Sequence, residues 1–213
     1  MTLPVLYHYW RSSASYRVRV ALNLLGIGYE PVAVDLLTSA QLAPEHLARN
    51  PQGLVPALAI DGQMLTQSLA IIEYLDETRP GTGLLPTDPL GRQRVRALSY
   101  AVAMEIHPIT NLDVASHVMA ITGGGDAARK AWMQKFNGER LARLETLLAQ
   151  HPSSTFSHGE TLTMADICLV PQVYNAERWG VDLAAMPRIR AIVDACLPLP
   201  AFQAAHPDRF KPG

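Results

Sequence analysis

The stretch Arg11-Ser12-Ser13-Ala14-Ser15-Tyr16-Arg17-Val18-Arg19-Val20-Ala21-Leu22 follows a short strand-like run over residues 4–9 and opens a helix. Three serines crowd the start of that helix. A helix N-terminus presents unpaired backbone N–H groups and the positive end of the helix dipole, so these hydroxyls can cap the helix or stabilise an anion such as a thiolate. Serines are common at helix starts, so the stretch alone leaves both interpretations open.

A second segment, residues 50–75, predicts a strand, a tight turn, a strand and a helix in that order. Asp61-Gly62 between apolar runs is a strong hairpin signal, and Ser68 occupies the position of an N-cap before apolar residues at helical spacing. With the alternating run at residues 29–34, the predicted order is βαβ, a long connection, then ββα. This is the order of a thioredoxin-like α/β domain, in which an extended ligand can pair with backbone just before Pro56.

The second half of the chain predicts helices. Asp88 is expected to cap a helix with Pro89 in its first turn, and apolar residues recur at helical spacing until the glycines at 123–125 break the chain. The run at residues 127–149 predicts an antiparallel neighbour. Thr163-Met164-Ala165-Asp166 has the spacing of a capping box, which we assign to folding rather than chemistry.

Three regions follow from this pattern. We expect a thioredoxin-like domain over residues 1–82, a linker over residues 83–89 within a stretch rich in Gly and Pro, and an all-α domain over residues 90–213.

The composition of the chain excludes several classes of function. The chain has 213 residues, 48% of them hydrophobic, and a formal net charge of -1, which suit a compact protein with one or two cores. Dispersed Lys and Arg residues argue against nucleic acid as a partner. No apolar run approaches the roughly 20 residues that span a bilayer, and the N-terminus lacks the layout of a signal peptide. We therefore expect a cytoplasmic protein with no membrane partner.

Only two cysteines are present, Cys168 and Cys196, and both lie in apolar helical patterns. They predict buried thiols rather than a disulfide or a metal site, and no other spacing of His, Cys or Asp predicts a metal. Because no Cys-x-x-Cys exists, dithiol exchange through the chain's own cysteines is disfavoured. Sulfur chemistry in this fold would need a borrowed thiol, that is, one supplied by a bound small molecule.

The serine-rich helix start carries a family resemblance. The chain resembles the zeta class of glutathione transferases, whose signature Ser-Ser-x-Ser-x-Arg-Val-Arg matches residues 12–19. The resemblance covers nearly the whole chain and continues through residues 67–75, 106–108, 162–166 and 170–178. It implies glutathione as the thiol cofactor, a helical domain that contributes the pocket for the electrophile, and a homodimer.

The same resemblance implies where the thiol lies. It places the sulfur near Ser13, with Ser12, Ala14 and Ser15 forming the surrounding turn. Zeta enzymes often have cysteine at the position of Ala14, so reductive dehalogenation through a protein cysteine is a poor prediction here. Shifting the pKa of a thiol by one unit takes only about 1.4 kcal/mol of preferential thiolate stabilisation, which one or two hydroxyl or N–H donors can supply.

The remaining glutathione contacts are implied by the same alignment. Val55, before an expected cis Pro56, would pair its backbone with the cysteinyl portion, and Gln67 and Ser68 would hold the γ-glutamyl carboxylate. Further candidates near the glycyl end or the subunit-facing side are Gln41, His107 and Asn111. His107 can equally pack between helices without touching a ligand.

The resemblance also implies the electrophile. A diketo diacid such as maleylacetoacetate needs cationic anchors, for which Arg11 and Arg178 are the matching candidates, although arginines on helices are often only solvated. Asp113 stands where bacterial relatives often carry arginine, and an acid there would repel a substrate carboxylate. Maleylpyruvate, a shorter diacid, is therefore the main competing substrate.

The expected reaction is a cis–trans isomerisation in which the sulfur adds to the alkene, the resulting single bond rotates and the thiolate leaves. Two other function classes stay open. A general transferase that conjugates electrophiles would leave glutathione on its product, and a binding module would bind glutathione without turnover.

Overall fold

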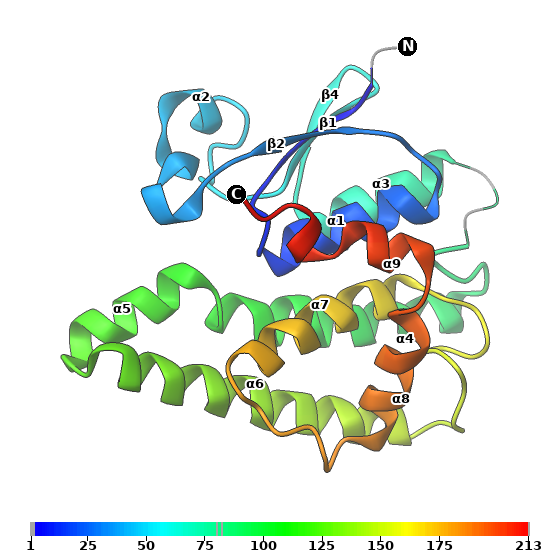
Figure 1. Cartoon of the computed structure of the whole chain (residues 1–213). Coiled ribbons are helices and arrows are strands. Elements are labelled where there is room, and N and C mark those ends of the chain that lie inside the picture. The colour runs from blue at the N-terminus through cyan, green and yellow to red at the C-terminus, as the bar shows by residue number, and fades with distance from the viewer. Residues whose placement is uncertain (1–2, 80, 82, 213) are drawn as a thin grey trace. The chain divides into compact units, whose positions relative to one another are not determined.

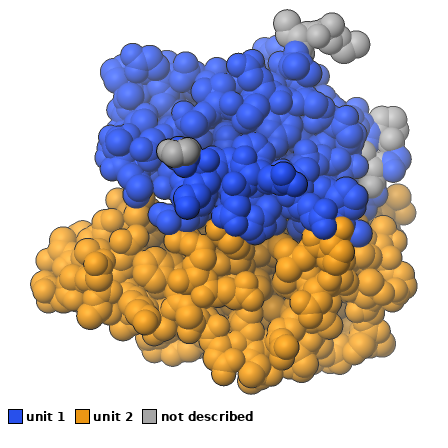
Figure 2. Space-filling view, viewed as in Figure 1, with its two compact units in different colours: residues 1–84, 199–213 blue, residues 85–198 orange. Residues whose placement is uncertain are grey.

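The computed structural model describes residues 3–79, 81 and 83–212. The chain forms two compact units, one of residues 1–84 with 199–213 and the other of residues 85–198 (Figure 2). The sequence placed residues 199–213 with the helical domain, whereas in the structure they pack as part of the first unit. Residue 82, the expected domain boundary, lies outside the described residues.

The first unit contains the predicted thioredoxin-like order (Figure 1). Its main elements are β1 (Val5–His8), α1 (Ser13–Leu24), β2 (Glu30–Ala33), β3 (Ala57–Ile60), β4 (Gln63–Thr66) and α3 (Ser68–Thr78). The sheet order is β2-β1-β3-β4, with β1 parallel to β2 and β3 antiparallel to both β1 and β4. The long connection holds two 3₁₀ turns, Leu36–Thr38 and Ala40–Leu42, and the short helix α2 (Pro44–Leu47). The mixed sheet confirms the predicted fold class.

The core of this unit lies between the sheet and two helices. Leu6 of β1 and Leu58 of β3 are fully buried, as are Val18 and Leu22 of α1 and Ile72 of α3. Each such side chain contributes about 1.5–3 kcal/mol when it leaves water. Helices α1 and α3 therefore pack as neighbours against the sheet, and both begin at the same end of the unit (Figure 1).

The C-terminal segment packs on α1 through helix α9 (Pro200–Ala205) and the 3₁₀ turn Pro207–Arg209. Asn23 Nδ2 donates a hydrogen bond to the carbonyl of Ala201 at 3.2 Å, and the Tyr16 hydroxyl donates to the carbonyl of Phe202 at 3.5 Å. These contacts explain why residues 199–213 belong to the first unit.

The second unit is helical throughout its main elements. These are α4 (Pro89–Tyr100), a π-helical stretch (Ala101–Ile106), a 3₁₀ turn (His107–Ile109), α5 (Leu112–Thr122), α6 (Gly125–Ala149), α7 (Met164–Arg178) and α8 (Pro187–Cys196). Asp88 Oδ1 accepts from the Gly91 N–H at 2.7 Å, which confirms the predicted cap. The apolar run up to residue 109 is not one regular α-helix, because its last turns change to π and 3₁₀ geometry.

The capping box is confirmed at the start of α7. Asp166 Oδ2 accepts from the Thr163 N–H at 2.8 Å, and Asp166 Oδ1 accepts from the Ser157 N–H at 2.7 Å. Helix α7 is buried along most of its length, and both Cys168 and Cys196 are buried free thiols as predicted. Across the described residues, none of the helices combines the length and apolar character needed to cross a membrane.

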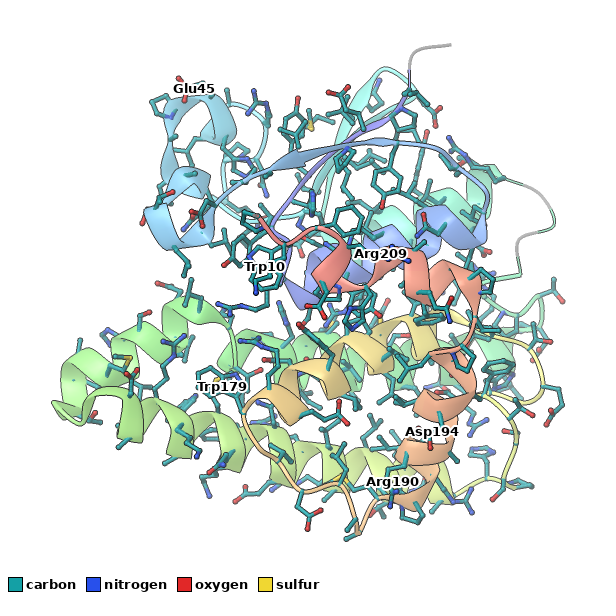
Figure 3. The ribbon with its side chains drawn as sticks, viewed as in Figure 1. Trp10, Glu45, Trp179, Arg190, Asp194 and Arg209 are labelled. Atoms are coloured by element: carbon teal, nitrogen blue, oxygen red, sulfur yellow. The ribbon has the colours of Figure 1, made fainter. Side chains whose placement is uncertain are left out.

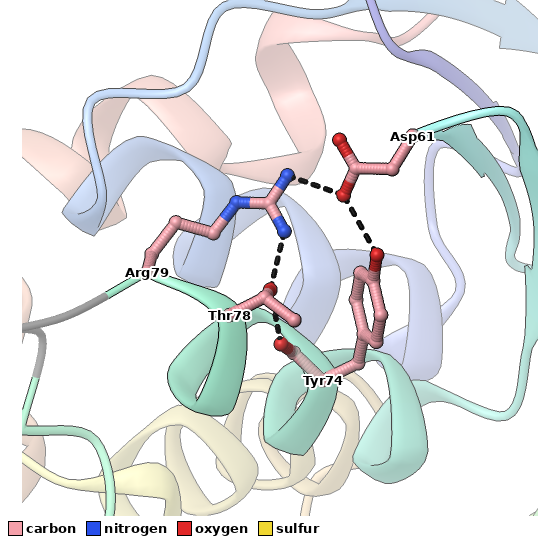
Figure 4. A network of polar contacts seen from close by, with 4 residues as sticks. All are labelled: Asp61, Tyr74, Thr78 and Arg79. Atoms are coloured by element: carbon pink, nitrogen blue, oxygen red, sulfur yellow. Dashed lines mark hydrogen bonds and ion pairs between the residues drawn. The ribbon is translucent and has the colours of Figure 1, made fainter.

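A polar network ties the β3–β4 hairpin to the end of α3 (Figure 4). Asp61 and Gly62 have φ values of 53° and 74°, which fits the predicted two-residue turn. Asp61 Oδ2 accepts from the Tyr74 hydroxyl at 2.8 Å and from Arg79 Nη2 at 2.7 Å. These hydrogen bonds lower the pKa of Asp61 from its ordinary value of 3.8.

Asp61→Asn tests this network, since asparagine tolerates the same backbone while losing the charge. A depressed folded pKa contributes stability that is present above the unfolded pKa and lost as pH falls through the folded pKa. The group is exposed, so we expect the melting temperature to fall by only about 1–2 °C at neutral pH. Calorimetric melting should show the difference from wild type vanishing below pH 3.8. A constant difference across that range would contradict the assignment.

Candidate active site

The first turn of α1 is fixed by its serines. Ser12 is the N-cap, and its Oγ accepts from the Ser15 N–H at 3.2 Å. The Ser12 N–H donates to the Tyr9 carbonyl at 3.1 Å, while Ser15 Oγ accepts from the Tyr9 N–H at 3.4 Å. Ser12 and Ser15 thus serve as acceptors that hold the turn, and each hydroxyl still has a proton to donate.

Ser13 and Ala14 begin the helix itself and are buried. The first turn of α1 contains no acidic residue, so no side chain of its own neutralises the positive end of the helix dipole. The turn can therefore stabilise an anion at Ser13 through hydroxyl and backbone N–H donors. Arg11 lies just before it, with its Cζ atom 5.0 Å from the centre of the Trp10 ring.

A second helix start lies at α3. The sequence placed the N-cap at Ser68, and this assignment was wrong by one residue. Gln67 is the N-cap, with a left-handed φ of 67°, and the turn that this backbone makes brings Ser68 into the helix as its first residue. Gln67 Nε2 donates to Gln52 Oε1 at 2.9 Å. Neither its backbone angle nor this contact was predictable from spacing.

A buried arginine of α1 is hydrogen-bonded to the start of α3. Arg17 is 1% exposed, and its Nη1 donates to Ser68 Oγ at 3.3 Å. Sequence reasoning noted Arg17 and Arg19 only as part of the signature at residues 12–19 and did not predict their burial; Arg19 is fully buried. The available signal was the placement of both residues inside an apolar helix that must pack on the sheet.

Two further predicted residues of the first unit lie at the long connection and before β3. The Val55–Pro56 peptide bond is cis, as expected. Gln41 is part of a 3₁₀ turn, and its Oε1 atom is buried with no hydrogen-bond partner among the described residues. A buried carbonyl oxygen without a partner is costly, so a ligand with an N–H donor fits this position.

The other candidates belong to the second unit. His107 begins the 3₁₀ turn, and Asn111 is the N-cap of α5, where its Oδ1 accepts from the Val114 N–H at 2.9 Å. Arg178 ends α7 with its Cζ atom 5.9 Å from the centre of the Tyr174 ring, and Asp113 lies in the first turn of α5. The capping role of Asn111 was not predicted.

A cavity inside the second unit does not include any of these residues. Its walls are formed by two arginines and by apolar and serine side chains: Arg94, Leu148, Pro152, Ser153, Ser154, Phe156, Ser157, Pro187, Arg188, Ala191 and Ile192. This cavity therefore contains none of the site residues that the sequence indicated.

This combination of a thioredoxin-like sheet, serine-rich helix starts and a helical second unit defines a class of protein. Residues 6–83 match the model of the glutathione S-transferase N-terminal domain, and residues 139–195 match that of the glutathione S-transferase C-terminal domain. The chain belongs to the glutathione transferase family.

Full-length relatives narrow the class further. The chain is 67% identical over 208 residues to a maleylacetoacetate isomerase of Rhizobium meliloti (strain 1021), covering 98% of both chains. A holo structure of a bacterial zeta-class maleylpyruvate isomerase shares 46% identity at a TM-score of 0.92, covering 95% of this chain and 96% of that one. A maleylacetoacetate isomerase of Methylobacterium extorquens AM1 with bound malonate and glutathione shares 41% identity at a TM-score of 0.93, covering 98% of both. Within the family, this chain is a member of the zeta class.

Arg17→Lys tests the link between α1 and the start of α3. Lysine keeps the positive charge but loses the planar fork, so Ser68 loses its positioned donor. We expect glutathione to bind about tenfold more weakly or worse, measured by titration calorimetry, because one charge-assisted hydrogen bond contributes about 1.5–3 kcal/mol. Gln134→Ala, in the second unit, is the control. Equal affinity in the Arg17 variant and the control would show that Ser68 needs no such support.

Proposed function

We propose that this chain is a glutathione-dependent cis–trans isomerase that converts maleylacetoacetate to fumarylacetoacetate. The 67% identity to a maleylacetoacetate isomerase over 98% of the chain carries the proposal. The serine-rich start of α1, the absence of a Cys-x-x-Cys pair from the sequence and the buried acceptor of Gln41 support a borrowed thiol as the reagent.

The chain's own residues would hold glutathione along the first unit. Ser13 would donate to the sulfur while Ser12, Ala14 and Ser15 form the turn around it. The backbone of Val55 would pair with the cysteinyl portion in strand-like fashion, since it lies two residues before β3.

The two ends of the tripeptide would meet different residues. Gln67 and Ser68 would receive the γ-glutamyl carboxylate at the start of α3, where backbone N–H groups and the helix dipole favour an anion. Gln41 Oε1 would accept from an N–H of the ligand. His107 and Asn111 would also contact the ligand, and this part of the proposal rests on the family match alone.

Bound glutathione supplies the sulfur nucleophile that adds to the cis double bond and leaves again after the bond has rotated. The protein's task is to keep that sulfur ionised, and donors at Ser13 and the helix start would lower its pKa by favouring the charged form. Arg11 and Arg178 would hold the substrate carboxylates and stabilise negative charge that develops on the diketone oxygens. No proton transfer by a side chain is required.

An absorbance assay of cis-to-trans conversion tests the function, run in parallel on maleylacetoacetate and maleylpyruvate, with and without catalytic glutathione. Total glutathione is followed by mass spectrometry. Turnover that needs glutathione but does not consume it establishes an isomerase. Glutathione found on the product would instead identify a conjugating transferase, and binding without turnover of either diacid or of a neutral electrophile would identify a binding protein.

Maleylpyruvate is the second candidate substrate, because a maleylpyruvate isomerase is 46% identical to the chain. Asp113 is the reason to compare the two substrates, since an acid near a substrate carboxylate would select against one of the two diacids. The preferred substrate in the parallel assay decides between them.

We further propose that the protein acts in the cytoplasm as a homodimer. This proposal rests on its membership of the glutathione transferase family. Residues 1–82 would bind glutathione and the helical residues 90–198 would bind the electrophile, whereas residues 199–213 pack with the first unit. Sedimentation at several protein concentrations tests the dimer.

Ser13→Ala should lower turnover at neutral pH by about 10- to 100-fold, because loss of a donor worth about 1.5–3 kcal/mol raises the pKa of the bound thiol. Activity should recover partly as pH rises and ionises the thiol without help. Steady-state kinetics across pH measure both effects. Unchanged turnover at neutral pH would remove Ser13 as the sulfur donor.

Arg178→Ala should raise the Michaelis constant about tenfold for the diacid and leave that for a neutral electrophile nearly unchanged, since only the diacid loses a charged partner. Arg190→Ala, on the exposed face of α8, is the matched control. An equal rise for both substrates would indicate lost packing rather than a lost carboxylate anchor.

A further inference from the structure

Arg19 connects three separate parts of the first unit through its guanidinium group. Its Nε donates to the carbonyl of Ala205 at 2.9 Å, its Nη1 donates to His8 Nδ1 at 3.1 Å, and its Nη2 donates to the carbonyl of Trp10 at 3.0 Å. The side chain is fully buried. One rigid fork therefore joins the end of β1, the turn before α1 and the C-terminal segment.

The C-terminal segment also covers this guanidinium. The Phe210 ring centre lies 4.6 Å from Arg19 Cζ, and the same ring packs edge-on against His8 at 5.2 Å. Burial and the charge of Arg19 lower the pKa of His8 to about 4, so His8 is neutral at physiological pH. The neutral Nδ1 can then accept from Arg19, which completes the arrangement.

Trp10 lies in the middle of the 9–12 turn, which leads directly into Ser12 and Ser13. The ends of this turn are held by the hydrogen bonds of Tyr9 with Ser12 and Ser15. The hydrogen bond from Arg19 to the Trp10 carbonyl fixes its centre. Figure 3 labels Trp10 in this turn and Arg209 in the C-terminal segment, the two regions that Arg19 connects.

We propose that Arg19 is a positioning residue for sulfur activation, and that the C-terminal residues around Phe210 act with it by holding the guanidinium in place. The inference rests on the proposed function of the 12–15 serines. Hydrogen bonds weaken steeply with distance and angle, so a small displacement of the 9–12 turn reduces the stabilisation of a thiolate at Ser13. The C-terminal segment thereby becomes part of the thiol-activating apparatus.

Arg19→Lys keeps the charge and removes the fork that reaches three acceptors. The pKa of bound glutathione is read from the ultraviolet absorbance of the thiolate as pH is varied. We expect this pKa to rise by about one unit, so that the thiolate fraction and turnover at neutral pH fall up to about tenfold and recover at high pH. The Michaelis constant for glutathione should change much less than turnover.

Asn23→Ala is the matched control, because Asn23 holds the same C-terminal segment at Ala201 but has no hydrogen bond to the 9–12 turn. It should lower the melting temperature and leave the pKa of bound glutathione unchanged. Phe210→Ala provides a second test that leaves Arg19 in place and removes the ring that covers it, and it carries the test if Arg19→Lys does not fold. We expect a smaller rise of the bound thiol pKa in this variant.

The outcomes separate this inference from the proposed function. Wild-type protein that fails to bind glutathione, or binds it without lowering its pKa, removes the function and the inference together. Wild-type protein with a lowered bound pKa that Arg19→Lys and Phe210→Ala leave intact overturns the inference alone. A rise in Asn23→Ala as large as that in Arg19→Lys also overturns it, because general loosening of the segment would then explain both.

Discussion

The burial of two guanidinium groups in α1 is the constraint on which the thioredoxin-like unit depends. A buried charge costs several kcal/mol unless its donors are satisfied, so neighbouring backbone and side-chain acceptors must lie where the fork can reach them. Arg19 meets this demand fully, with acceptors at β1, at the 9–12 turn and at the C-terminal segment, whereas Arg17 Nη1 finds its acceptor at the start of α3. Through these contacts the two arginines tie α1 to the start of α3 and to the turn before Ser12.

This arrangement explains how a site with so few charged groups can be well defined. The serines of the α1 start are small, and their hydroxyls are fixed by local hydrogen bonds rather than by ion pairs. Preorganised donors need no rearrangement when an anion arrives, which is the condition under which hydrogen bonds contribute most to stabilising it. The structure therefore combines rigid backbone with hydroxyl donors, a combination that suits a borrowed thiol.

The helical unit follows a different principle. Its central helix α7 is buried almost along its whole length, and its start is satisfied internally by the carboxylate of Asp166. Burial raises the pKa of Asp166, and the hydrogen bonds from Ser157 and Thr163 oppose that shift in part. The capping box thus stabilises the centre of this unit and leaves its chemistry to other residues, as its sequence pattern had indicated.

Local patterns in the sequence determined the elements: the strand–helix–strand order, the Asp61-Gly62 hairpin, the Asp88 cap and the Thr163–Asp166 capping box. Each depends on residues close in the chain, where spacing and turn chemistry act directly. Tertiary structure alone decided that Gln67 rather than Ser68 caps α3, which acceptors the buried Arg17 and Arg19 reach, and that residues 199–213 join the first unit. The arginine contacts depend on acceptors supplied by distant parts of the chain, Ser68 for Arg17 and Ala205 for Arg19, and no local pattern records where such partners come to lie.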